Sequence, residues 1–149
     1  MINTVNEIQV SYKPNREFTD KFKINTSKDA HFLLEKVFDP DTINLREEFI
    51  ILYLNRANRV LGYYKAFTGG LASVVCDTKL ILAVALKSMA SGIILAHNHP
   101  SGSLVPSEQD KAITRRVKVA CQNLDIQLLD HLILVPDGGF TSLADENLI

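Results

Sequence analysis

Apolar residues recur along this chain at two different spacings, and the change of spacing predicts helices and strands in turn. Residues 48–55 and 60–67 are typical of two strands, which the turn-prone segment 56–59 would join as a hairpin. Before them a helix is expected over residues 27–38, capped by Ser27 and ended by Pro40. Its apolar face consists of Ala30, Leu33, Leu34, Val37 and Phe38.

The second half of the chain continues this alternation. A short strand is expected over residues 71–76, a helix over 78–90 and a buried strand over 92–96. The longest helix should run from Ser107 to about Leu124, followed by two strands over 127–135 and 140–143. This order favours an α/β fold, in which a mixed sheet has helices on both sides. Residues 1–26 are polar with scattered apolar positions, so we expect an N-terminal extension, able to form an edge hairpin, before a domain over 27–149.

Composition fits one compact domain and gives no global reason to bind polyanions. The chain has 149 residues, of which 46% are hydrophobic and 22% charged, so it can bury one good core. Sixteen basic residues against 17 acidic ones leave a formal charge of −1, which does not favour nucleic acid or an anionic membrane.

The two cysteines and the hydropathy pattern point to an intracellular protein. Cys76 and Cys121 lie in apolar surroundings without Cys-x-x-Cys spacing, so we expect buried thiols and not a disulfide framework or a zinc knuckle. The first residues lack a basic-then-apolar signal sequence, and no apolar run approaches the roughly 20 residues that span a bilayer. The cytoplasm is the expected compartment.

A candidate metal site follows the apolar run 92–96. In a strand, residues two apart point to the same face, so His97 and His99 should project together at its carboxyl end. Pro100 ends the strand, and Asp110 should lie in the first turn of the next helix. Two imidazoles and a carboxylate suit zinc and leave a fourth position open, which is typical of a catalytic site. Such a site usually needs a further carboxylate to move the proton of a water molecule.

The spacing of His97, His99, Ser107 and Asp110 resembles the JAMM motif of the JAB/MPN metallopeptidases. The segments 94–102, 114–116, 129–133 and 138–140 are similar to the bacterial RadC branch of that family, and the resemblance covers about residues 28–149. It implies a cytidine-deaminase-like α/β/α architecture and one zinc ion per chain, held by the two histidines and the aspartate.

The same resemblance assigns the remaining chemistry. In this family a serine assists at the site, which corresponds to Ser107, and a glutamate near the start of an early strand acts as general acid/base. Segment 46–55 looks like that strand, and the family's glutamate lies two residues before a phenylalanine, here Phe49, which selects Glu47. The alternation of strand side chains says only that either Glu47 or Glu48 faces the site, not both.

The resemblance implies a zinc-dependent hydrolase that cleaves an amide or isopeptide bond in a peptide or protein substrate. Glu47 would move the proton, and Ser107 would donate to the developing oxyanion. The alternative is a DNA-repair-associated accessory domain that keeps the metal without peptidase activity. The basic residues that would support it more simply form a solvated helix face: Lys111, Arg115, Arg116 and Lys118. A zinc deaminase would need His-x-Glu and a Cys-x-x-Cys pair, and neither occurs.

Structural interpretations compete at several of these positions. Ser107 and Asp110 also have the form of a helix capping box. An aspartate bound to zinc could not easily reach back to the cap, and of the two roles we favour Asp110 as a ligand. Glu47 and Glu48 could both be solvated charges at the start of a strand. His131 is expected to be a hydrogen-bonded structural residue, and His31 a surface residue. Segment 75–79 departs from the Pro-Arg-Glu usual in RadC-like chains, which puts nearby substrate contacts in doubt.

Overall fold

A computed structural model describes Lys13, residues 22–68 and residues 77–149 of the chain. Within these ranges the elements are α2 (Ser27–Val37), β1 (Glu48–Leu54), β2 (Val60–Thr68), α3 (Thr78–Lys87), β3 (Gly92–Asn98), α4 (Glu108–Gln122), β4 (Gln127–Leu134) and β5 (Phe140–Ser142). The expected strand over 71–76 and most of the expected extension lie outside the described residues.

These elements confirm the predicted order, with small differences at their ends. Thr26, and not Ser27, is the N-cap of α2, because its hydroxyl accepts from the Asp29 amide while the Asp29 carboxylate accepts from the Thr26 amide. Helix α3 ends at Lys87 and not at Ala90, because Met89 adopts a left-handed conformation with φ of 55°.

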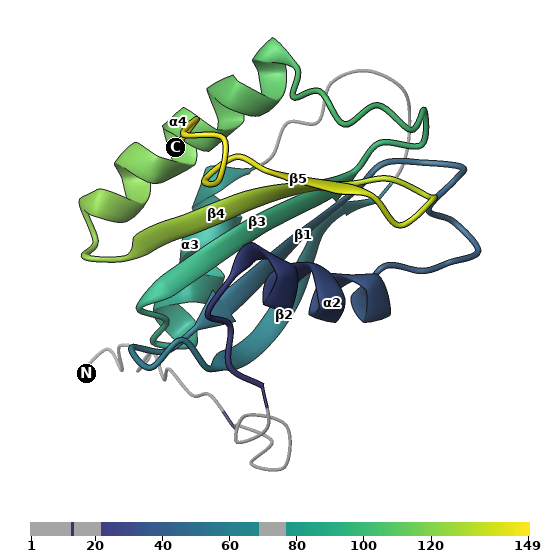
Figure 1. The fold of residues 1–149 in the computed structure, drawn as a ribbon. Helices are drawn as coiled ribbons and strands as arrows, with labels where there is room; N and C mark the ends of the chain where they lie inside the picture. Colours follow the sequence, from purple (N-terminus) through teal and green to yellow (C-terminus); the bar gives the residue numbers. More distant parts are fainter. Residues whose placement is uncertain (1–12, 14–21, 69–76) are drawn as a thin grey trace, which may run out of the picture.

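The strands form one mixed sheet in the order β2-β1-β3-β4-β5 (Figure 1). Strand β1 pairs antiparallel with both β2 and β3, and β4 pairs antiparallel with β5. The β3–β4 pair is parallel, and α4 provides the crossover that such a pair requires. The predicted α/β fold with a mixed sheet is therefore confirmed.

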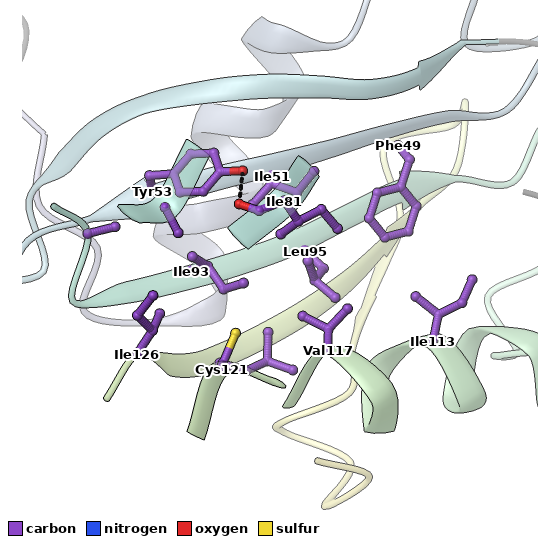
Figure 2. Packing of buried hydrophobic residues seen from close by; sticks show 13 residues of the cluster. Phe49, Ile51, Tyr53, Ile81, Ile93, Leu95, Ile113, Val117, Cys121 and Ile126 are labelled. Atoms are coloured by element: carbon purple, nitrogen blue, oxygen red, sulfur yellow. Dashed lines mark hydrogen bonds between the residues drawn. The ribbon is translucent and has the colours of Figure 1, made fainter. Parts of the chain in front are cut away.

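Helices cover both faces of the sheet. Helix α2 covers one face, which we call the α2 face, where alternate β1 residues such as Ile50 and Leu52 are buried. Helices α3 and α4 cover the other, the α4 face, where Phe49, Ile51 and Tyr53 pack (Figure 2). The Tyr53 hydroxyl donates to the Ile81 carbonyl of α3 at 3.0 Å, which satisfies its buried polar atom.

The last residues of the expected N-terminal extension contact the β1–β2 hairpin. Lys23 forms a bridge with Arg59, the Ile24 amide donates to the Asn58 carbonyl, and the Val60 amide donates to the Phe22 carbonyl. Ile24 is buried on the α2 face. Across residues 22–68 and 77–149, no helix has the length and apolar character needed to cross a bilayer.

Candidate metal centre

The three predicted ligands meet where β3 ends and α4 begins. His97 is the sixth residue of β3, His99 follows the strand, and Asp110 lies in the first turn of α4. The His97 Nε2 atom lies 2.9 Å from His99 Nε2 and 3.1 Å from Asp110 Oδ1, and His99 Nε2 lies 3.5 Å from Asp110 Oδ2. One potential ligand atom from each residue thus falls within 4.8 Å of the others.

The hydrogen on the His99 ring is fixed by the loop that leads to α4. His99 Nδ1 lies 2.7 Å from the Ser103 carbonyl oxygen, which can only accept, so Nδ1 carries the hydrogen. In neutral imidazole the other nitrogen then has a free lone pair, and this is the Nε2 that points at the candidate site.

A chain of buried hydrogen bonds fixes His97 in the same tautomer. The Thr114 hydroxyl donates its one hydrogen to the Asp110 carbonyl at 2.6 Å, so it must accept from His131 Nδ1, also at 2.6 Å. His131 is fully buried, and this burial lowers its pKa well below the ordinary value, so its Nε2 is a bare acceptor. His97 Nδ1 lies 2.8 Å from that Nε2 and therefore carries the hydrogen, which leaves His97 Nε2 bare.

Two bare imidazole nitrogens and a carboxylate oxygen consequently point at one another. Such a group of acceptors is stable only with a cation between them, either a shared proton or a metal ion. The Asp110 carboxylate raises the pKa of His99. Burial by itself would raise the pKa of Asp110, but the neighbouring His97 and His99 rings, when they share a proton with this carboxylate, outweigh it and hold that pKa well below its usual range. The donor set fits zinc, which binds neutral imidazole and ionised carboxylate.

Asp110 also completes a capping box with Ser107, the N-cap of α4. Its Oδ2 accepts the Ser107 amide at 2.7 Å, and the Asp110 amide donates to Ser107 Oγ at 3.1 Å. Because a carboxylate has two oxygens, the capping role of Asp110 leaves it within reach of both histidines. The expectation that a zinc-bound Asp110 would not reach the cap stays a prediction. Oδ2 accepts the Ser107 amide and lies 3.5 Å from His99 Nε2, while Oδ1 lies 3.1 Å from His97 Nε2. The cap fixes the orientation in which Asp110 presents its free oxygen.

Glu47 and Glu48 face opposite sides of the sheet. Glu48 lies on the α2 face, is only 2% exposed, and accepts from the Thr42 hydroxyl at 2.9 Å and Lys65 Nζ at 3.4 Å. The interpretation of Glu48 as a solvated charge is wrong, since this carboxylate is buried and ion-paired. Glu47 is exposed, and its negative charge is among the causes that raise the pKa of His99, after the hydrogen bond with Asp110.

Comparison with known proteins agrees with this geometry. A family model described as "RadC-like JAB domain" matches residues 24–148. This chain belongs to the RadC-like JAB domain family. It is similar to a UPF0758 protein of Flavobacterium johnsoniae, with 39% identity over 126 residues, 85% of this chain and 53% of the relative. A UPF0758 protein of Porphyromonas gingivalis is 38% identical over 137 residues, 91% of this chain and 59% of the relative. The chain thus spans little more than half the length of these relatives.

Sequence reasoning missed two supports of the metal centre in this RadC-like domain. Thr114 was given no role, although it lies four residues after Asp110 and so on the same side of α4, which is a usable signal. Phe49 was only a marker for Glu47. Its ring stacks on His97 with a centroid distance of 5.8 Å and an interplanar angle of 9°, and it meets His131 edge-on at 5.6 Å. His131 has the structural, hydrogen-bonded role expected of it, and that role orients a ligand.

Other residues that the sequence analysis named lie outside the candidate metal centre of this RadC-like domain. His31 is not a surface residue: its side chain is only 14% exposed, because the ring stacks on Phe140 at 4.3 Å. Cys121 is buried as expected, and burial raises the pKa of its thiol to about 11, whereas Cys76 and segment 75–76 lie outside the described residues. On α4, Lys111 pairs with Glu108 at 2.8 Å and Arg115 is exposed.

Proposed function

We propose that this RadC-like domain is a zinc-dependent hydrolase of the JAMM type, acting on an amide or isopeptide bond. His97, His99 and Asp110 would hold one zinc ion per chain. The observation that supports this most directly is the convergence of three acceptor atoms from two elements, each held in the required orientation by a hydrogen bond behind it.

A zinc ion bound by these residues would supply a Lewis acid that polarises a carbonyl group and lowers the pKa of water. Glu47 is exposed, and its charge acts on His99, so its carboxylate would take a proton from the attacking water and deliver it to the leaving amine. Ser107 is exposed beside the triad, and the cap uses its oxygen as an acceptor, so the hydroxyl hydrogen can be directed at a developing oxyanion.

A peptide or an isopeptide-linked protein is the proposed substrate. The alternative, a DNA-associated accessory domain without peptidase activity, depends on the basic residues of α4. In the described part of the chain Lys111 of that group is already paired with Glu108, so we favour the hydrolase.

Metal analysis tests the site, and turnover tests the activity. The purified protein should hold about one zinc per chain, and His97→Ala and Asp110→Ala should lose it while Asp145→Asn, whose carboxylate accepts from the Ser27 hydroxyl, keeps it. With zinc bound, a library of peptides and isopeptide-linked peptides should yield new termini by mass spectrometry.

Glu47→Gln should keep zinc but lower the rate by roughly 100-fold or more, the usual size of a lost general acid/base. The matched control is Glu146→Gln, because Glu146 is exposed at the far end of the chain, whereas Glu48 is ion-paired and unsuitable. Equal zinc content in wild type and the ligand variants would refute the site. Bound zinc without hydrolysis, together with salt-sensitive retention of DNA, would favour the alternative.

A further inference from the structure

Asn98, the residue between the two histidine ligands, is fully buried and points to the opposite face of the sheet. It cannot be a ligand, yet all of its hydrogen-bonding groups are used. Its Oδ1 accepts from the Glu48 amide at 2.7 Å, and its Nδ2 donates to the carbonyls of Ile43 and Arg46 at 2.8 and 2.9 Å. We propose that Asn98 is a positioning residue, which fixes the backbone of Glu47 and so directs this carboxylate toward the metal ligands.

Two of the three peptide groups that Asn98 binds lie on either side of Glu47. The Arg46 carbonyl belongs to the peptide bond before Glu47, and the Glu48 amide belongs to the peptide bond after it. Because each peptide group is planar, only φ and ψ of Glu47 separate the two planes. One side-chain amide that holds both planes therefore sets these two angles, and with them the direction of the Glu47 Cα–Cβ bond.

The third bond extends this clamp to the turn that precedes Glu47. Residues 39–46 form consecutive turns, in which the Ile43 amide donates to Asp39 and the Arg46 amide to Thr42, and Asn98 ties this segment down through the Ile43 carbonyl. Loops 39–47 and 99–107 lie at the same end of the sheet in Figure 1. Asn98 thus links the loop that bears Glu47 to strand β3, which bears His97.

The residue type follows from this geometry. The clamp needs one acceptor and two donors on a planar group, which only a carboxamide supplies among side chains of this size. Aspartate would lose both donors, and alanine would lose all three bonds. An error of about 1 Å in placing a catalytic group can cost about 100-fold in rate, so a residue that never touches substrate can still control the reaction.

This inference rests on the proposed role of Glu47, so its test includes measurements that need no turnover. Asn98→Ala should speed hydrogen exchange at the Glu48 amide while metal content stays at that of the wild type. In the cobalt-substituted protein, Glu47→Gln should move the pH midpoint of the visible spectrum downward, because a negative charge near the metal is lost. Asn98→Ala should move it in the same direction. Asn44→Ala, an exposed asparagine of the same loop, should leave both measurements unchanged.

With an active zinc enzyme, Asn98→Ala should lower kcat by about 100-fold with little change in KM. Adding Glu47→Gln should then cost little more, because the two variants remove the same contribution. If Asn98→Ala does not fold, Asn98→Ser, which stays neutral and polar but is too short to hold both peptide groups, takes its place in every measurement. A cobalt midpoint that shifts in Glu47→Gln but not in the Asn98 variant would overturn the positioning role alone. No shift in Glu47→Gln would refute the proposed acid/base and the inference with it.

Discussion

Removing the Thr114 hydroxyl should weaken zinc binding, although Thr114 touches no ligand atom of the site. The hydroxyl is buried between the Asp110 carbonyl and His131 Nδ1, at 2.6 Å from each. Valine has nearly the same shape as threonine, so Thr114→Val removes the acceptor of the His131 Nδ1 hydrogen and the donor to the Asp110 carbonyl with little change in packing. His131 is then free to carry its hydrogen on Nε2, where it opposes the hydrogen that His97 Nδ1 donates.

The size of the effect follows from the two hydrogen bonds. A buried donor left without a partner costs about 1–3 kcal/mol, which should appear as lower stability of the metal-free protein. Loss of an outer hydrogen bond that orients a histidine ligand usually costs about 10–100-fold in metal affinity. At about 1.4 kcal/mol for each factor of ten, both estimates describe a change of similar size.

Zinc affinity is measured by competition with a chromophoric chelator, and stability by urea unfolding of the metal-free protein. Thr114→Ser keeps the hydroxyl and should resemble wild type in both. Thr78→Val is the matched control, because Thr78 begins helix α3 and takes no part in the hydrogen bonds that lead to His97. A Thr114→Val protein that binds zinc as tightly as wild type would show that this chain of hydrogen bonds does not set the tautomer of His97.

Three further outcomes are expected. Burial raises the pKa of Asp130, so its contribution to the free energy of unfolding is full below about pH 3.9 and is lost as pH rises through the folded-state pKa. Asp130→Asn, which does not titrate, should therefore gain stability relative to wild type as pH rises above about 4, until Asp130 is ionised in the folded protein; a constant difference would contradict this. Cys121 should resist alkylation at pH 8 until the protein unfolds, as read by peptide mapping. Chelation of zinc should lower the unfolding midpoint by an amount equivalent to roughly 2.7 kcal/mol at 100 times the dissociation constant, with circular dichroism still showing a folded protein.

The sequence alone determined the elements and the three residues that could hold a metal ion, because both depend on neighbours along the chain. Apolar spacing located the described helices and strands to within a few residues at their ends. His97 and His99 share a face because strand side chains alternate, and Asp110 follows them across one short loop. Sequence resemblance also selected Glu47 over Glu48, a choice that alternation could not make.

Only the tertiary structure decided what holds these residues in place. His131 reaches His97 because β4 pairs parallel with β3, and Asn98 reaches Arg46 because β1 pairs antiparallel with β3. The buried Glu48 carboxylate pairs with Lys65 from β2, and Asp110 contacts both the Ser107 amide and His97 because a carboxylate has two oxygens. Local spacing shows which way a side chain points from its own element. The partner that it meets there comes from a distant part of the chain, because the register of the sheet and the packing of the helices bring the two together.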